Sequence, residues 1–204
     1  MRTFRLLLGL LSTVAIAAML WYAFQVFGTD PLADKEEYRQ YIAQGLKALN
    51  ASEAGWQTMV IATTRDIDAP RDKVWEEWRK VEKWTEWSAF HLNSFWKGGS
   101  EWKVGGKFEQ VMRVGWPYET LRAVERIDLV FVPDRAAYIR EEGSPSSYTF
   151  WRFEFLPGGK TKVTAVEVLH SSEIGFLRPV IEKRWQRDLE KSLNGLVEYV
   201  RRAK

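Results

Sequence analysis

The 204-residue sequence contains no cysteine and only two histidines. Without cysteine, the chain forms no disulfides, has no thiol nucleophile and cannot bind a metal through sulfur. His91 and His170 lack the H-E-x-x-H spacing of a histidine metal site, and the serine hydrolase motif G-x-S-x-G does not occur either. The sequence therefore predicts no metal, no cofactor and no recognisable catalytic residue.

Excess charge of one sign is also lacking. The formal net charge is +3, and without Arg2 and Arg5 the chain has 28 basic residues against 27 acidic ones. Proteins that bind the phosphate backbone normally carry a clear excess of lysine and arginine. We therefore expect no nucleic acid partner. Basic residues near the C-terminus are interpreted as the solvated face of a helix, with a weak membrane-surface contact as the alternative.

Tryptophan, by contrast, is abundant, with 11 residues. Nine of them lie between Trp75 and Trp185. Such side chains either fill a large core or line a pocket, because an indole offers a broad apolar face with a single hydrogen-bond donor. Both interpretations remain open at the level of sequence.

The N-terminal region contains 22 consecutive residues without a charge, Leu6–Phe27. A helix of that length is about 33 Å long, enough to cross a bilayer. A cleaved signal peptide ending near Ala17 is the alternative, but the apolar run continues for ten residues beyond it. We expect an uncleaved, single-pass anchor. Arg2 and Arg5 favour a cytoplasmic N-terminus, with the following domain on the extracytoplasmic side.

Three regions follow from these patterns: a transmembrane anchor over 1–28, a juxtamembrane linker over 29–55 and a domain over 56–204. The linker carries apolar residues at helical spacing, namely Tyr38, Ile42, Leu46 and Leu49. They predict a short helix that either packs on the domain or lies at the membrane interface.

The domain begins with a strand and a short helix, because Gln57–Ile67 alternates and Pro70 suits a first helical turn. A second helical turn covers Val81–Trp87. Alternating segments separated by turn residues then predict an antiparallel sheet over 93–97, 104–114, 118–127, 136–142, 148–155 and 161–170. An apolar stripe from about Ile174 to Arg202 predicts a long amphipathic helix. This order favours an α+β fold with a curved antiparallel sheet around the C-terminal helix.

Several short motifs carry a family resemblance over about residues 56–203. They are Ile67-Asp68-Ala69-Pro70 with Val74-Trp75, Trp84 with Trp87, Val104-Gly105-Gly106, and Leu156-Pro157-Gly158-Gly159 before Thr161-Lys162-Val163-Thr164. With the closing helix, they resemble the START-like, or Bet v 1-like (SRPBCC), superfamily, which includes polyketide cyclases and lipid-binding domains. The resemblance implies a helix-grip fold. Ser88 follows Trp87, where many members have proline.

The resemblance also implies an apolar cavity between the sheet and the long helix. We expect its lining to include Trp87, Phe108, Met112, Tyr118, Tyr138, Trp151, Phe153 and Trp185. The alternative for each is ordinary core packing. His91 is expected at the surface or at the cavity mouth. Glu125, Glu167, Arg113 and Arg65 are candidates for an acid–base pair, but no pairing among them follows from the sequence.

The sequence thus predicts a membrane-anchored domain that binds a hydrophobic small molecule or lipid. A polyketide cyclase- or dehydratase-like enzyme is one alternative. An interaction module whose cavity is collapsed by its own tryptophans is the other, and it would expose an apolar patch instead. The sequence defines no oligomeric state.

Overall fold

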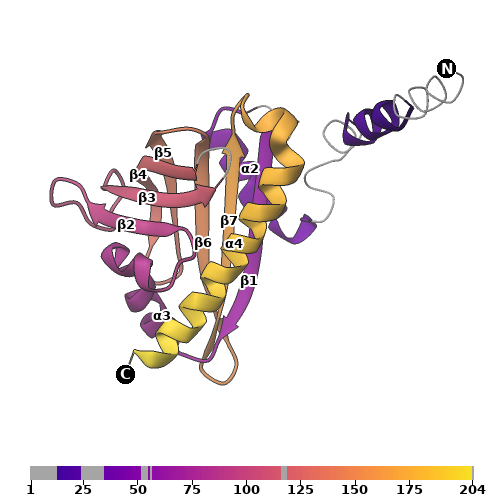
Figure 1. Ribbon diagram of the computed structural model, residues 1–204. Helices are drawn as coiled ribbons and strands as arrows, with labels where there is room; N and C mark the ends of the chain where they lie inside the picture. The colour runs from indigo at the N-terminus through magenta and orange to yellow at the C-terminus, as the bar shows by residue number, and fades with distance from the viewer. Residues whose placement is uncertain (1–12, 24–34, 52–54, 56, 116–118, 204) are drawn as a thin grey trace, which may run out of the picture.

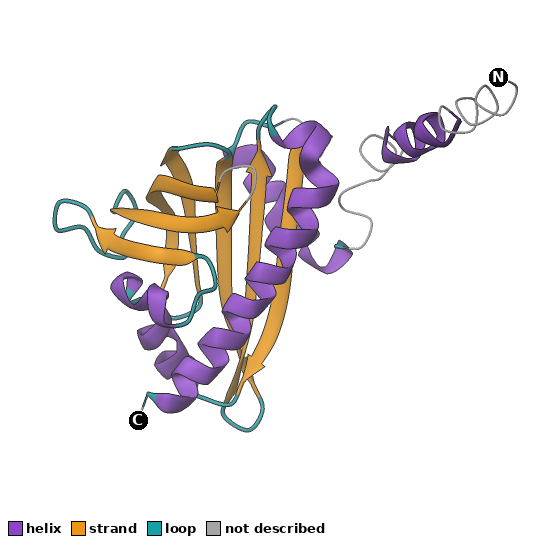
Figure 2. Ribbon diagram, in the orientation of Figure 1, coloured by secondary structure: helices purple, strands orange, loops and turns teal. Residues whose placement is uncertain are grey.

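Seven antiparallel strands form one curved sheet in the order β1-β7-β6-β5-β4-β3-β2 (Figures 1 and 2). The computed structural model describes residues 13–23, 35–51, 55, 57–115 and 119–203. The strands are β1 (Thr58–Ile67), β2 (His91–Trp96), β3 (Lys107–Gly115), β4 (Glu119–Phe131), β5 (Arg135–Glu142), β6 (Ser146–Leu156) and β7 (Lys160–His170). The predicted meander is confirmed.

Chain order and turn chemistry explain this topology. Strands β2 to β7 pair with their neighbours in sequence, and β1 then pairs with β7, which brings the start of the domain beside its last strand. The β6–β7 turn contains Gly158 and Gly159 at φ +82° and +74°. A residue with a Cβ rarely adopts this left-handed conformation, so the two glycines suit the tight reversal.

The long helix α4 (Ile174–Arg202) lies across the inner, concave face of the sheet (Figure 1). Its apolar stripe is buried there and includes Ile181, Trp185, Leu189, Leu193 and Leu196. The short helices α3 (Arg71–Trp78) and η2 (Val81–Glu86) pack at one end of the same face. The expected α+β, helix-grip architecture is therefore confirmed.

A short helix covers the opposite, outer face of the sheet. The segment η1 (Glu36–Tyr38) leads into α2 (Arg39–Ala48), which packs on β6 and β7 behind the sheet in Figure 1. Tyr38 and Ile42 are buried there, in a second apolar cluster. Of the two predictions for the linker helix, the structure therefore shows the one in which it packs on the domain.

The expected transmembrane span over 6–27 lies only partly within the described chain, where residues 13–23 are helical. No helix among the described residues is both long enough and apolar enough to cross a membrane.

Candidate functional site

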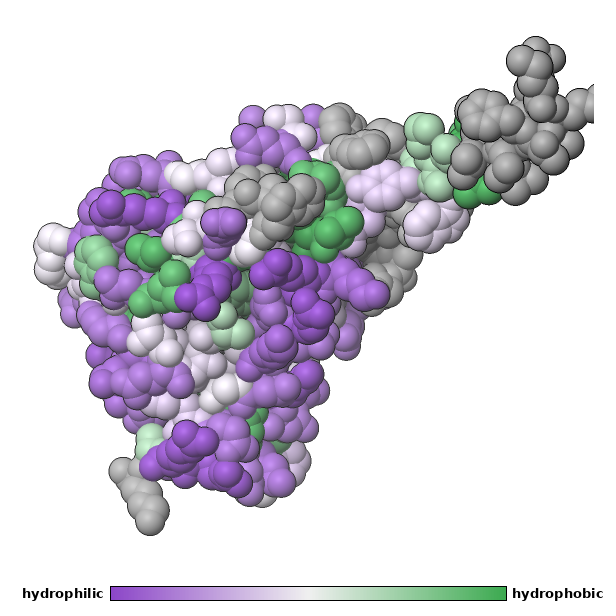
Figure 3. Space-filling view, viewed as in Figure 1, coloured by the Kyte–Doolittle hydropathy of each residue, from purple (hydrophilic) through white to green (hydrophobic). Residues whose placement is uncertain are grey.

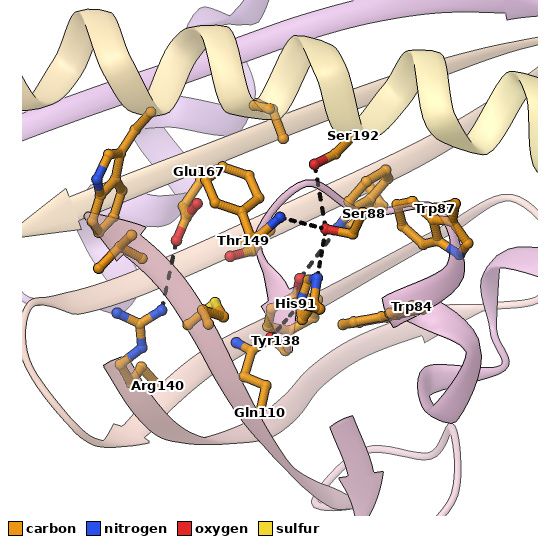
Figure 4. Close-up of a pocket in the computed structure, with 16 residues that line it drawn as sticks. Trp84, Trp87, Ser88, His91, Gln110, Tyr138, Arg140, Thr149, Glu167 and Ser192 are labelled. Atoms are coloured by element: carbon orange, nitrogen blue, oxygen red, sulfur yellow. Dashed lines mark hydrogen bonds and ion pairs between the residues drawn. The ribbon is translucent and has the colours of Figure 1, made fainter. Parts of the chain in front are cut away.

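A pocket lies between the inner face of the sheet and α4. It is lined by side chains from η2, β2, β3, β5, β6, β7 and α4, and by the segment that joins η2 to β2. The lining residues are Trp84, Trp87, Ser88, Phe90, His91, Gln110, Met112, Val114, Tyr138, Arg140, Thr149, Trp151, Glu167, Trp185, Leu189 and Ser192. Figure 4 shows these side chains converging from the sheet and from α4. The walls are mainly apolar, as in most small-molecule sites.

The pocket is narrow. The space open to the centre of a water molecule is about 40 Å³. A single water needs roughly 10–15 Å³ on this measure, so the space holds a few water-sized groups. Figure 3 shows hydrophobic side chains beside α4, over β2 and β3, on a face that is otherwise mainly hydrophilic.

An aromatic cluster fills the adjacent part of the interior. Trp78 packs against Trp75, Trp102 and Phe153, with ring centroids 5.2, 4.5 and 5.1 Å away. The Trp84 indole donates a hydrogen bond to the Trp78 carbonyl at 2.6 Å. The tryptophans thus divide: some form a solid core, and Trp84, Trp87, Trp151 and Trp185 face the remaining space. Both sequence-based interpretations hold, each for a different subset.

Polar side chains form a hydrogen-bonded row across the pocket floor (Figure 4). His91 Nδ1 lies 2.6 Å from Ser88 Oγ, and His91 Nε2 lies 2.7 Å from Gln110 Oε1. The Gln110 amide nitrogen donates to Glu125 at 2.7 Å. The Gln110 carbonyl oxygen therefore faces the histidine, so Nε2 carries the proton and Nδ1 accepts from the Ser88 hydroxyl.

Burial keeps His91 neutral. Burial lowers the pKa of His91 to about 4, because desolvation disfavours the charged imidazolium, and the Gln110 hydrogen bond opposes this only in part. Ser88 Oγ also lies 3.3 Å from Ser192 Oγ, and Ser192 accepts from the Ala89 amide at 2.9 Å. The row thereby joins the sheet to α4.

An arginine between two carboxylates continues the row. Arg140 Nε donates to Glu125 Oε1 at 2.9 Å, and Arg140 Nη1 donates to the Pro145 carbonyl at 2.8 Å. The ion pair of Arg140 Nη2 with Glu167 Oε1 is longer, at 3.7 Å. The side chains of Arg140, Glu125 and Glu167 are 1%, 0% and 15% exposed, so Glu167 is the carboxylate nearest to solvent.

Burial also strongly shifts the pKa values of two further groups in the pocket. It raises the pKa of Glu167 to about 7, with Arg140 opposing and Glu125 adding to the shift. Burial also raises the pKa of Tyr138, which therefore stays a phenol at neutral pH. Titratable groups with displaced pKa values in a cleft are typical of binding and catalytic sites.

The structure brings five of the eight predicted lining residues to the pocket: Trp87, Met112, Tyr138, Trp151 and Trp185. Phe108 and Phe153 are fully buried in the aromatic cluster and lie outside the lining, because neighbouring indoles cover them. Tyr118 lies outside the described residues.

Of the acid–base candidates, Glu125 and Glu167 meet, but only through Arg140. Arg65 bonds to Asn194 and Thr63, away from the pocket lining. The sequence reasoning missed Arg140, Gln110, Thr149, Ser88 and Ser192. Strand parity would have placed Gln110 beside Met112 on the inner face, and the serine after Trp87 was a visible departure from the family pattern.

Metal binding finds no support in the described residues. No group of three or more His, Asp or Glu side chains there is arranged to hold a metal ion.

Comparison with known proteins identifies the fold. No family model matches the chain, and no curated relative matches it. Solved structures do match. The protein TTHA0849 from Thermus thermophilus has a TM-score of 0.60 and 19% identity, covering 71% of this chain and 99% of that one. The chain shares the fold of that protein.

Two further matches carry descriptive names. A START superfamily protein from Mycobacterium smegmatis has a TM-score of 0.57 and 10% identity, covering 71% of this chain and 99% of that one. The Zhui aromatase/cyclase from a Streptomyces species has a TM-score of 0.58 and 19% identity, with coverages of 71% and 94%. At these identities, the similarity establishes the START-like fold and nothing finer.

Proposed function

We propose that this START-like domain binds a small, mainly apolar molecule in the pocket between the sheet and α4. The observation that supports this is the combination of an aromatic wall with polar groups set inside it. Trp84, Trp87, Trp151 and Trp185 supply the wall, and Glu167 stands among them. Apolar walls bind by burial of surface, and a few fixed polar groups give orientation.

The size of the pocket favours a compact molecule over a lipid. A space of about 40 Å³ for water centres is far too small for the long acyl chain of a membrane lipid unless the walls move. The aromatic cluster resists such movement, because close-packed interiors repack at a cost. A lipid ligand would therefore require the walls of the pocket to move apart.

The proposal includes a membrane location. Its support is the uncharged stretch over 6–27, with Arg2 and Arg5 before it. This arrangement favours a single-pass anchor with the domain on the extracytoplasmic side. An anchored domain would meet apolar molecules at the high local concentration that a bilayer provides.

Native mass spectrometry of the detergent-extracted full chain tests the binding proposal. We expect a co-purifying molecule that appears as a mass added to that of the chain. Because it is bound non-covalently, it should be lost completely when the complex is activated in the gas phase. Leu189→Trp should abolish it, because the larger side chain enters the pocket. Val180→Trp on the exposed face of the same helix should retain it. If the species stays in folded Leu189→Trp protein, the pocket is not its site. If none co-purifies and none can be added, an interaction module is the better model.

The absence of cysteine makes the membrane orientation easy to test. Ser172 is exposed just before α4, and Ser172→Cys would carry the only thiol in the chain. We expect a membrane-impermeant maleimide to label this variant in intact cells. Labelling only after lysis would place the domain in the cytoplasm, and recovery of the protein without detergent would contradict the anchor.

A second candidate is a cyclase- or dehydratase-like reaction. It is favoured by Glu167, whose pKa of about 7 suits proton transfer near neutral pH, and by the neutral His91 in the same pocket. It predicts turnover of the co-purifying molecule by the protein as isolated. Unchanged mass of that molecule after prolonged incubation would favour binding alone.

A further inference from the structure

The charges in the pocket do not balance. Two carboxylates, Glu125 and Glu167, share one guanidinium, that of Arg140. Arg140 commits two donors to Glu125 and the Pro145 carbonyl at 2.9 and 2.8 Å, and lies 3.7 Å from Glu167. With both carboxylates ionised, this group carries one negative charge. Glu167 has the weaker pairing and is the one of the two carboxylates that lines the pocket.

The other lining residues supply no compensating cation. Among the described residues that line the pocket, Arg140 alone carries a positive charge, because His91 is held neutral by burial. Helix α4 contributes Trp185, Leu189 and Ser192, which are all uncharged. Outside the lining, the Arg184 guanidinium packs over Gly115 and lies 3.8 Å from Asp188. The described lining therefore offers an anion no cation other than Arg140, which two carboxylates already share.

The aromatic walls act in the same direction. The π faces of tryptophan and tyrosine carry partial negative charge and attract a cation that lies within about 6 Å of the ring. Five such rings line the pocket: Trp84, Trp87, Tyr138, Trp151 and Trp185. In Figure 4, Glu167 projects into the space between the sheet and α4 that these side chains enclose.

We propose that the pocket selects hydrophobic amines, with the ammonium group paired to Glu167 and the apolar group packed on the tryptophans. This inference rests on the proposed binding function and names its ligand class. An ammonium ion would supply the missing positive charge. It would also remove the penalty that burial imposes on ionised Glu167, whose pKa of about 7 reflects that penalty.

The test compares three probes that share one apolar group: hexylamine, 1-hexanol and hexanoate. Binding to the full chain in detergent micelles is followed by tryptophan fluorescence at pH 8. For the unsubstituted protein we expect hexylamine to bind at least tenfold more tightly than hexanol, and hexanoate to bind most weakly. Carboxylate–ammonium pairs that are largely removed from water are strong enough for such a ratio.

Glu167→Gln should reduce the affinity for hexylamine about tenfold and leave that for hexanol within about twofold. Glu154→Gln makes the same change on the outer face of β6, where Glu154 pairs with Arg152, and should alter neither. Both variants are measured in the same micelles, so the partition of each probe into the detergent affects the two variants equally. Circular dichroism checks that each is folded, and Glu167→Ala provides a second removal of the carboxylate if Glu167→Gln is unfolded.

Each other result overturns the inference. Equal affinity for hexylamine and hexanol would show that the charge of the probe does not affect binding. Tighter binding of hexanoate would show that the pocket prefers an anion. A preference for hexylamine that persists without the Glu167 carboxylate assigns it to another group. Failure of all three probes overturns the proposed binding function itself, and the amine preference with it.

Discussion

The two faces of the sheet are covered by helices in different ways. On the outer face, α2 packs closely enough that a Cβ on Gly45 would lie 2.7 Å from Val168 Cγ2. On the inner face, α4 packs closely along β1, and a Cβ on Gly195 would clash with the Trp87 carbonyl oxygen. Large side chains separate α4 from the central strands, and a pocket remains between Trp185 and these strands. Alternation along β7 separates the two environments, with Val166 and Val168 outside and Glu167 inside. The difference indicates that close helix contact seals one face, while bulky spacers leave room at the other.

The largest effect is expected from the inner face. Arg140→Met leaves Glu125 fully buried without its cation and Glu167 without its ion pair. Removing one partner of a buried ion pair typically costs about 3–5 kcal/mol. We expect urea unfolding to report that loss for the full chain. Arg126→Met removes a half-buried arginine that pairs with Glu141. Arg126→Met should lower the free energy of unfolding by about 1 kcal/mol or less. Equal losses in the two variants would contradict the expected difference between the buried and the half-buried ion pair.

The pH dependence of stability should also come from the inner face. Because the folded pKa of Glu167 lies at about 7, above its usual 4.5, the folded state binds more protons than the unfolded state between these values. The contribution of Glu167 to the free energy of unfolding is then fully present below pH 4.5. It falls as the pH rises towards 7, by at most about 3 kcal/mol.

Comparison with Glu167→Gln isolates the contribution of Glu167 to the pH dependence of stability. His91 acts in the opposite sense, since its pKa is lowered to about 4 and its contribution to stability is lost as the pH falls from 6.5. The unfolding free energy of Glu167→Gln minus that of the unsubstituted protein should therefore rise between pH 4.5 and 7, because the glutamine does not ionise. A difference that stays flat across this range would mean that Glu167 titrates normally.

On the outer face, the expected effect is steric. Gly45→Leu places a side chain against Val168 and Tyr148, where no room exists. Overpacking typically costs about 1–3 kcal/mol, partly offset by about 1 kcal/mol from the better helix propensity of leucine. Gly55 has no atom within 4 Å of an added Cβ, so Gly55→Leu is the matched control. Thermal unfolding that is unchanged in Gly45→Leu would show that α2 is not closely packed.

The smallest effect is expected at the link between α4 and the pocket. Ser192→Ala removes the oxygen that accepts from the Ala89 amide, which costs about 0.5–1.5 kcal/mol. Ser172→Ala, at an exposed position before α4, should change the urea midpoint little. A loss of several kcal/mol in Ser192→Ala would reveal a larger role for the hydrogen-bonded row than its distances indicate.

Much of the fold could be predicted from local sequence. The alternation in Gln57–Ile67, the Pro-Gly-Gly turn before β7 and the apolar stripe of α4 each reflect a short-range rule. The pocket was harder, because aromatic residues satisfy the pattern for a core and for a lining equally well. Phe108 and Trp151 both lie on inward positions, but only Trp151 faces the space.

The buried charges could not be predicted as a group. Arg140, Glu125 and Glu167 lie on β5, β4 and β7, and their meeting depends on register across several strands and on the curvature of the sheet. Periodicity assigns a side chain to a face, but it does not say which residue of another strand lies opposite.

The amino-acid sequence alone determined the order of helices and strands, the resemblance to START-like proteins and the uncharged N-terminal stretch, because each depends on neighbours along the chain. Only the tertiary structure decided that α2 seals the outer face, that some tryptophans pack solidly while others line a pocket, and that one arginine pairs with two carboxylates. These outcomes depend on distances between residues far apart in the chain, which packing sets and local patterns do not encode.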